Sequence, residues 1–419
     1  MINFYRFNYK FIFKNTLSFL VSISLVALFH NLYIRLSSNR IFHERDICDD
    51  LQNKILSLNS NMKDDFSVTV INDEGIQIID INSFMPLIPA SNLKLFTTAY
   101  ALDKLTTKFK LQTRLVLDSQ GEFHLFGSGD PDINSIHISL LSKEIGNYIR
   151  NNNYMIKRPY VLSIHEAKVS NWWPDTWSNI DRNQIYGAPI TKLPYSGNST
   201  NTTILDPTKI LKNRLGYLVG TMIADNQLII NFDRSDKSFV TKEQASTVFT
   251  SSPMQSLLSL ANSESHNFTA EVLLRNASGT WNNDKATRNL TTWINNQGIR
   301  LSDISIYDGS GLSRMNRLTT YSISSLLWKM SNHRSWYFYK STLSVLGIKG
   351  TLTNFEIDDT IKGRFYGKTG TLDGVRSISG VLDALDGRAF ISVISNNHIL
   401  QDDIISQIIK LVFYSSSCL

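Results

Sequence analysis

The chain has 419 residues, of which 42% are hydrophobic and 19% are charged. This composition is typical of a folded globular protein, and the length allows two or three domains with a sizeable core. The net charge is only +6 and Lys and Arg form no block, so we expect no nucleic-acid partner.

The N-terminus carries a basic start followed by an apolar run. Arg6, Lys10 and Lys14 precede the apolar segment Leu17–Phe29. This pattern is typical of an export signal, because a membrane-spanning helix needs roughly 20 apolar residues. A buried globular helix fits less well, since it would not need the basic flank. No clear cleavage site follows, so residues 1–40 are predicted to be either a signal peptide or an N-terminal membrane anchor.

The remainder of the chain begins and ends with elements that suit one shared sheet. In chain order, the hydrophobic patterns predict a helix in 44–58, two strands in 66–80, a helix over 93–105, a hairpin in 376–395 and a helix in 399–413. Asp386-Gly387 is a strong turn signal within that hairpin. The stretch 107–248 is more mixed and strand-rich. It is predicted to be an insert in a domain formed by residues 41–106 and 249–419.

The predicted helix over 93–105 has a serine and a lysine at its opening. Ser91 and Lys94 are three positions apart, so their side chains share one helix face, about 5–6 Å apart at Cβ. A serine hydroxyl becomes a useful nucleophile when a base accepts its proton, and a buried lysine with a lowered pKa can be that base. The pattern alone is weak, because Ser-x-x-Lys occurs again at Ser60 and Lys63.

Two later triplets strengthen this interpretation. Ser-His-Asn at 265–267 precedes an apolar helical run, and Lys-Thr-Gly at 368–370 lies on a predicted strand that enters the C-terminal hairpin. Ser-x-Asn is common in this chain, whereas Lys-Thr-Gly occurs once. In this order, the three motifs form the serine acyl-transferase set of penicillin-binding proteins and serine β-lactamases.

A wider likeness is carried by PASNLKLFTTAYAL, GSGDP, SSPMQSLLSLANSESHNFTAEVLLR, YDGSGLSRMNRLT and GKTGTLDGVRSISG. Through these segments the chain resembles the D-alanyl-D-alanine carboxypeptidase/endopeptidase family of class C low-molecular-mass penicillin-binding proteins, over most of 86–397. The resemblance implies an α+β fold, with a penicillin-binding/β-lactamase-like transpeptidase domain interrupted by a strand-rich insert. That domain has an antiparallel sheet with helices on both sides. Gly367 and His266 depart from the residues that members often have there, but neither change removes a reacting group.

The resemblance also implies catalytic roles. Ser91 would attack the penultimate D-Ala carbonyl of a peptidoglycan stem peptide, or a D-Ala cross-link, forming an acyl-enzyme. Lys94 would be the general base, while Ser265 and Asn267 would relay protons and hold the acyl amide. β-Lactam antibiotics would acylate the same serine as covalent inhibitors, and neither a cofactor nor a metal is implied.

The substrate-binding residues implied by the resemblance are Lys368, Thr369, Gly370, Thr371, Ser310 and Arg314. Lys368 would bind the terminal carboxylate with help from the Thr369 hydroxyl. The backbone N–H groups of Ser91 and Thr371 would form the oxyanion hole, and Gly370 would let the strand approach the substrate.

The segment Asp308–Arg314 is predicted to be a structured loop, because it contains Asp-Gly and a further glycine. In the family this loop lies beside the cleft. Arg314 could therefore bind the diaminopimelate carboxylate of a stem peptide, with Asp181 and Tyr186 at its amine end. The alternative for Arg314 is a local ion pair or a helix cap.

Two other function classes share parts of this pattern. A class A β-lactamase needs a deacylating glutamate between the second and third motifs, and the chain has no glutamate between Val272 and Phe355. A catalytically inactive wall-binding protein would not need the full set of reacting side chains that is present here. We interpret Glu271 as a structural helix residue and the Trp-rich segment 171–177 as packing. The histidines show no metal-binding spacing.

The only cysteines are Cys48 and Cys418, so neither a disulfide framework nor a cysteine metal cluster is available. If the terminal helices pack side by side, the two cysteines could come within the Cα separation of about 4.4–6.8 Å that a disulfide needs. Otherwise they are small hydrophobic residues. Asn267 also begins a glycosylation pattern, and a glycan there would block the proposed site. We therefore expect a bacterial periplasmic location, with inner-membrane attachment if the N-terminal segment is retained.

Overall fold

The computed structural model describes residues 44–58, 65–151, 158–223, 228–235, 247–396, 401–415 and 418–419. The predicted signal peptide or anchor lies outside these ranges, as does the second Ser-x-x-Lys pair, Ser60 and Lys63. Within the described ranges, no helix is both long and apolar enough to cross a membrane.

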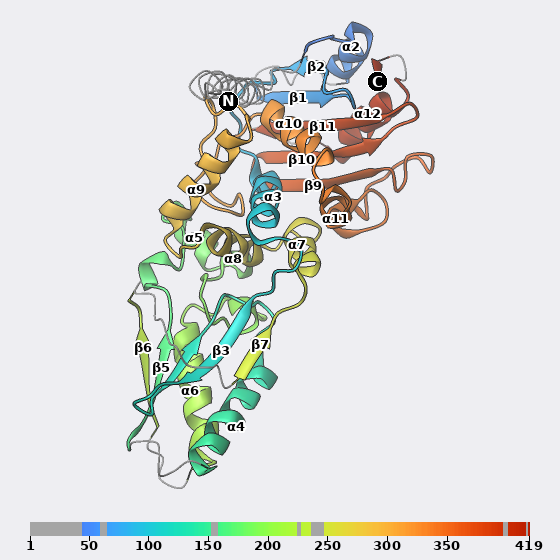
Figure 1. Cartoon of the computed structure of the whole chain (residues 1–419). Helices are drawn as coiled ribbons and strands as arrows, with labels where there is room; N and C mark the ends of the chain where they lie inside the picture. Colours follow the sequence, from blue (N-terminus) through green and yellow to red (C-terminus); the bar gives the residue numbers. More distant parts are fainter. Residues whose placement is uncertain are drawn as a thin grey trace, which may run out of the picture.

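The chain folds into two sheet-based units arranged end to end (Figure 1). The first unit contains a six-stranded antiparallel sheet in the order β2-β1-β11-β10-β9-β8. Its strands are β1 (Phe66–Ile71), β2 (Gln77–Ile81), β8 (Ser344–Val345), β9 (Phe365–Leu372), β10 (Val375–Asp383) and β11 (Arg388–Asn396). Because β1 pairs with β11, the expected single sheet from both ends of the chain is confirmed.

Helices cover both faces of this sheet, as the predicted fold class requires. One face packs against the amphipathic helices α2 (Asp49–Ser57) and α12 (Asp402–Phe413). The other face carries α10 (Thr320–Ser331) together with α3 (Leu93–Leu105), and α8 (Asn267–Ser278) packs against α3. The same unit also contains α7 (Met254–Asn262), α9 (Asn283–Asn296) and α11 (Trp336–Ser341). The site described below is built where α3, α8 and β9 meet.

The two terminal helices pack together, and a disulfide joins the segments beside them. α2 contributes Leu51 and Ile55 to the core that α12 shares, where burial of apolar surface drives the contact. Cys48 directly precedes α2, and Cys418 follows α12. The two form a disulfide with a Cα–Cα distance of 5.9 Å, so the pairing alternative is confirmed.

The second unit contains a five-stranded mixed sheet in the order β6-β5-β4-β3-β7. Its strands are β3 (Gln112–Leu117), β4 (Phe123–Phe126), β5 (Tyr160–His165), β6 (Leu228–Asp233) and β7 (Thr247–Thr250). β4, β5 and β6 are parallel, and the crossover connections between them contain α4 (Ser135–Asn151) and α6 (Pro207–Gly220). The predicted end of the insert at residue 248 lies within β7, and the division into domains stays a prediction.

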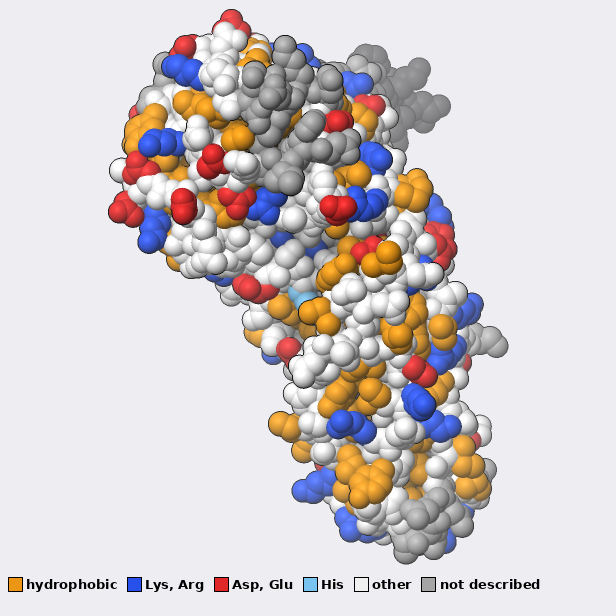
Figure 2. Space-filling model, turned by 180° about the vertical axis from the view of Figure 1, so that it is seen from behind, with side chains coloured by type: hydrophobic (Ala, Val, Ile, Leu, Met, Phe, Trp, Pro, Cys, Tyr) orange, Lys and Arg blue, Asp and Glu red, His pale blue; other side chains and the backbone are white. Residues whose placement is uncertain are grey.

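A hydrophobic core of its own holds the second unit together. Leu141 of α4 and Leu215 of α6 pack against strand residues such as Leu125 and Leu162. The space-filling view in Figure 2 shows the two units as two lobes, with hydrophobic side chains scattered over both. The chain enters this unit after the C-terminal end of α3 and returns through β7 to α7.

Candidate active site

Ser91 lies in a 3₁₀ turn, Ala90–Asn92, directly before α3. Ala90 has a φ of 47°, a left-handed conformation that residues other than glycine rarely adopt, so this turn is strained. Every residue from Leu93 to Leu102 is buried, which holds α3 and the turn before it firmly in place. The predicted helix over 93–105 is confirmed, and it fixes the position of the serine.

Lys94 extends from the first turn of α3 into the protein and has no exposed surface. Its Nζ lies 2.8 Å from Ser91 Oγ, 2.7 Å from Asn267 Oδ1 and 2.6 Å from the carbonyl oxygen of Ser310. Burial lowers the pKa of Lys94 to about 7, although the carboxylates of Asp308 and Glu271 favour its charged form. A neutral fraction therefore exists at pH 7, and it can accept the Ser91 proton over the same short distance.

The second motif is placed by the turn that leads into α8. Ser265 has a φ of 60°. This conformation directs its hydroxyl to within 3.1 Å of Ser91 Oγ. Asn267 is the first residue of α8, and its amide is oriented from both sides. The amide oxygen accepts from Lys94, and the amide nitrogen donates to the backbone carbonyl of Tyr186 at 3.0 Å.

His266 lies between these two residues, yet its side chain turns away from the reacting hydroxyl. Its Nδ1 is 2.8 Å from the Thr269 hydroxyl. Burial, reinforced by the charge of Lys94, lowers the pKa of His266 to about 4, while Asp132 acts weakly in the other direction. His266 is therefore neutral near pH 7 and serves to shape the turn.

The third motif lies on β9, against the turn that carries Ser91. A Cβ on Gly370 would be 2.9 Å from the backbone nitrogen of Ser91, so only glycine lets the strand approach this closely. Lys368 has no exposed surface, and its Nζ donates to the carbonyl of Thr369 at 2.7 Å. Burial, with a smaller effect of the Lys94 charge, lowers the pKa of Lys368 well below its usual range.

The predicted loop Asp308–Arg314 is indeed structured, and the buried carboxylate of Asp308 organises it. This carboxylate accepts from the backbone N–H of Gly311 at 2.9 Å and of Ser313 at 2.7 Å. It also accepts from the indole N–H of Trp177 at 2.9 Å. The sequence motif indicated a turn here, but it did not reveal that Asp308 faces inward.

Glu271 supports the same loop from the neighbouring helix. Its Oε1 accepts from the backbone N–H groups of Gly309 at 2.7 Å and Ser310 at 2.8 Å, and its Oε2 pairs with Arg275 at 3.1 Å. These contacts hold the Ser310 carbonyl against Lys94. Glu271 is thus a structural helix residue, as expected, with an additional effect on the site through the loop that it fixes.

A cleft of about 640 Å³ opens in front of the serine. Its lining includes Ser91, Ser265, Asn267, Gly311, Arg314, Thr371, Asp181 and Tyr186. Arg314 is exposed on this lining, which also includes Asp181 and Tyr186. Lys94, Ser310 and Lys368 have no exposed surface and lie beneath the lining. The carbonyl of Ser310 accepts from Lys94, and its predicted role in substrate binding stays a prediction.

The site thus combines a buried lysine, two serines and an asparagine. The sequence of the chain also matches a known protein family. Residues 59–233 and 234–413 match the D-Ala-D-Ala carboxypeptidase 3 (S13) family. The chain belongs to this family. The predicted family and enzyme class are confirmed: the protein is a serine DD-peptidase of the carboxypeptidase type.

Relatives and solved structures agree with this assignment. The chain is 22% identical over 403 residues to a D-alanyl-D-alanine carboxypeptidase of Actinomadura sp., covering 74% of each chain. It is 26% identical over 350 residues to a carboxypeptidase of Mycobacterium tuberculosis, covering 74% of this chain and 71% of the relative. Its fold matches penicillin binding protein 4 of Haemophilus influenzae with a TM-score of 0.68 at 16% identity, covering 86% of this chain and 98% of that one.

Proposed function

We propose that this DD-peptidase cleaves the terminal D-Ala-D-Ala bond of peptidoglycan stem peptides through an acyl-enzyme on Ser91. The observation that carries the proposal is the buried Lys94 Nζ, 2.8 Å from Ser91 Oγ, with a pKa lowered to about 7. As Ser91 Oγ attacks the penultimate D-Ala carbonyl, neutral Lys94 takes up the hydroxyl proton. Ser310 and Asn267 keep the amine directed at the serine, since each supplies Nζ with an oxygen partner.

The departing D-Ala needs a proton on its amine, and Ser265 is suited to deliver it. Its hydroxyl lies 3.1 Å from Ser91 Oγ and is part of the cleft lining. A proton taken up by Lys94 can return to the leaving nitrogen through this hydroxyl. Hydrolysis of the acyl-enzyme uses the same groups in reverse, with water in place of the leaving amine.

The negative charge that develops on the carbonyl oxygen is stabilised by the backbone N–H groups of Ser91 and Thr371. The close approach of β9 at Gly370 supports this assignment, because it brings the strand that carries Thr371 against the serine turn. Lys368 would bind the terminal carboxylate with help from the Thr369 hydroxyl. Its present burial disfavours the ammonium form, and an arriving carboxylate would restore that form by charge pairing.

Arg314 is proposed to bind a carboxylate on the side chain of the stem peptide. Its exposure on the cleft lining supports this role, as does the position of Asp181 and Tyr186 on the same lining. The Tyr186 hydroxyl donates to Asp181 at 3.1 Å, so the carboxylate of Asp181 is held in place. A diaminopimelate side chain carries both an amine and a carboxylate, which suits a cleft lined by both a carboxylate and a guanidinium.

The periplasmic side of a bacterial inner membrane is the proposed location. Two features support it: the basic and apolar N-terminal pattern in residues 1–40, and the Cys48–Cys418 disulfide, which needs an oxidising compartment. Attachment to the membrane would follow if the N-terminal segment is not cleaved.

Digestion of purified muropeptides tests the proposed reaction. Uncross-linked pentapeptides should lose one terminal D-Ala, and any endopeptidase activity would appear as the conversion of cross-linked dimers into monomers. Products separated by mass distinguish the two activities. Intact pentapeptides and dimers after incubation with protein that does bind penicillin would contradict the proposed hydrolysis.

A further inference from the structure

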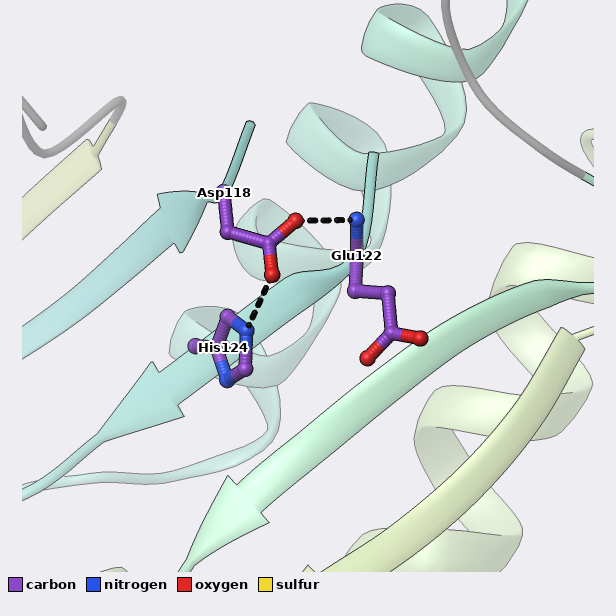
Figure 3. Close-up of side chains that lie close together, drawn as sticks. All are labelled: Asp118, Glu122 and His124. Atoms are coloured by element: carbon purple, nitrogen blue, oxygen red, sulfur yellow. Dashed lines mark hydrogen bonds and ion pairs between the residues drawn. The ribbon is translucent and has the colours of Figure 1, made fainter. Parts of the chain in front are cut away.

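The far end of the β3–β4 hairpin brings together a histidine and two carboxylates (Figure 3). Asp118 follows β3, Glu122 precedes β4, and His124 lies within β4. Their potential ligand atoms all lie within 4.8 Å of one another. The hairpin itself creates this convergence. Glu122 and His124 are two residues apart along an extended segment, so their side chains point to the same side.

The Asp118 carboxylate is held in position by the turn. Its Oδ1 accepts from the backbone N–H of Gln120 at 2.9 Å and of Glu122 at 2.8 Å. Its Oδ2 faces His124 Nε2 at 3.2 Å. Oδ1 thus stabilises the turn of the hairpin, while Oδ2 is directed at the histidine ring.

A second layer of side chains orients His124 from the neighbouring parallel strands. His124 Nδ1 lies 3.0 Å from His165 Nε2 on β5. His165 Nδ1 in turn lies 3.2 Å from Asp233 Oδ2, at the end of β6. His124 and His165 also lie close to the ring of Phe126, so both imidazoles are held in place by packing. The row Asp118–His124–His165–Asp233 therefore crosses the sheet.

The hydrogen bonds along this row indicate which ring nitrogen of His124 would face a cation. If His165 donates through Nδ1 to Asp233, its neutral Nε2 is an acceptor, and His124 must donate to it through Nδ1. In that tautomer, His124 Nε2 presents its lone pair towards Asp118 Oδ2, which is the form that a metal-bound histidine takes. A positive ion between these two atoms, beside Glu122, would bind both.

We propose that Asp118, Glu122 and His124 bind a divalent first-row transition-metal ion, with Zn²⁺ as the best match. Imidazole nitrogen and carboxylate oxygen both bind Zn²⁺ at about 2.0–2.2 Å, and two such ligands at a tetrahedral angle lie about 3.3 Å apart. The observed 3.2 Å between His124 Nε2 and Asp118 Oδ2 fits this separation. Water would fill the remaining coordination position. His165 and Asp233 would act as positioning residues, because a hydrogen bond to the other ring nitrogen fixes the orientation of a metal-bound histidine.

The ion would be structural rather than catalytic. β3 leaves the first unit after Leu111, and the chain returns towards it at Gly127, so the turn between Asp118 and Glu122 lies at the opposite end of the hairpin. Six residues of β3 extend roughly 20 Å. The metal would therefore join β4 to the row of side chains on β5 and β6 without touching the cleft. The sequence showed no metal spacing, because part of this arrangement arises only from the pairing of distant strands.

Zinc binding can be measured directly on the full chain, purified without a polyhistidine tag and stripped with a chelator. Equilibrium dialysis should give one Zn²⁺ per chain, and added Zn²⁺ should raise the Tm. The double variant Asp118→Asn/Glu122→Gln should weaken binding at least tenfold and remove the Tm increase. The first of these changes keeps an amide oxygen that can accept the two backbone N–H groups, so the turn is retained. The matched control Glu144→Gln, at an exposed carboxylate of α4, should bind like the parent.

A second variant tests the positioning residues separately. Asp233→Asn should weaken Zn²⁺ binding by about 10–100-fold, the usual effect of losing an outer partner of a metal-bound histidine, and the kcat/KM for peptides should be unchanged. If the parent retains no Zn²⁺, the proposal is wrong. It is equally wrong if the double variant binds Zn²⁺ as tightly as the parent.

Discussion

The two units of the molecule differ in whether their buried charged side chains include reactive ones. In the first unit, Lys94 and Lys368 are completely buried, and Lys94 has its amine within hydrogen-bonding distance of a hydroxyl at the floor of a cleft. In the second unit, the buried Glu166 accepts backbone N–H groups from Lys192 at 2.7 Å and Leu193 at 3.1 Å. The first unit keeps reactive groups poised, whereas the second uses a buried carboxylate to tie a loop to a strand end.

The free-energy cost of burying charged groups explains why this difference matters. Burying a charged group costs several kcal/mol unless partners compensate, so a protein retains such groups where they fix a structure or perform chemistry. Substitution of the buried groups near Ser91 should therefore change activity most strongly. Substitution within the hydrophobic core of the second unit, or at the edge of the first, should change stability and leave the chemistry alone. The predictions that follow test this division, beginning with the largest expected effect.

Ser91→Ala should abolish both penicillin acylation and peptide hydrolysis, with a loss of at least about 10⁴-fold, because the covalent route is removed. Labelled penicillin and mass spectrometry of the labelled peptide check this directly. The variant should remain folded, since removal of one oxygen leaves no cavity of note. Ser60→Ala, in the other Ser-x-x-Lys pattern, is the matched control and should retain full labelling. A label on Ser60, or one that persists in Ser91→Ala, would contradict the assigned nucleophile.

Lys94→Arg should lower the acylation rate by about 10²–10⁴-fold, the usual contribution of a general base. Arginine keeps the positive charge but does not lose its proton, so it separates the role of charge from the role of base. Stopped-flow acylation by a chromogenic β-lactam measures the effect. Lys368→Arg provides the contrast, because a residue that binds a carboxylate needs its charge and should tolerate this change better. Equal losses of acylation rate in both variants would contradict the assignment of Lys94 as the base and Lys368 as the carboxylate-binding residue.

The pH dependence should show the lowered pKa of Lys94. Only the neutral amine is a base, so acylation should fall about tenfold per pH unit below about 7 and level off above it. Folding stability should also depend on this group. The unfolded chain binds the Lys94 proton between about 7 and 10.5, where the folded protein does not, so its contribution to stability rises with pH across that window. A flat acylation rate between pH 5 and 8 would argue against a neutral lysine.

The sequence predicted the parts of the site that depend on local motifs. Ser91 and Lys94 share a helix turn, and their separation follows from helix geometry alone. The carboxylate of Glu271 was harder to assign, because its partners at Gly309 and Ser310 are 38 and 39 positions away in the chain. No periodic pattern encodes such a contact. It is determined by how α8 packs against the loop.

Contacts between distant parts of the chain also explain why the first sheet was predicted more fully than the second. Four strands of the first sheet, β1, β2, β10 and β11, were predicted from turn signals, and the sheet formed from both ends of the chain followed from their positions. The second sheet joins β4, β5 and β6 through long crossovers. Neither the order of these parallel strands nor the contact between His124 and His165 can be read from spacing. Such pairs depend on tertiary arrangement, and the sequence therefore indicates only a strand-rich region there.

Arg314→Ala should lower kcat/KM for diaminopimelate-containing peptides by about 10–100-fold, as expected for the loss of a charged hydrogen bond of about 1.5–3 kcal/mol. Penicillin lacks this side chain, so its acylation rate should change little. Arg317→Ala is a useful control, because Arg317 lies in the same loop region and its guanidinium donates to backbone carbonyls of that loop. If Arg314→Ala slows peptide and penicillin equally, the residue supports the fold of the loop rather than substrate selection.

Removal of the disulfide is expected to have the smallest effect on kcat/KM. The disulfide lies beside α2 and α12, on the face of the first sheet opposite to α3. The bond joins positions 370 residues apart, so it restricts the unfolded chain strongly, and its loss should cost about 2–4 kcal/mol of stability. Cys48→Ala/Cys418→Ala should therefore unfold at a lower Tm or lower denaturant concentration than the oxidised parent. The kcat/KM should stay the same, because α2 and α12 pack on the face that does not carry Ser91. Reduction of the parent should reproduce the lower Tm, whereas reduction of the variant should change nothing. A drop in kcat/KM at temperatures where the variant is fully folded would show that the two faces of the sheet are coupled, and the division between reactive and structural regions would then fail within the first unit itself.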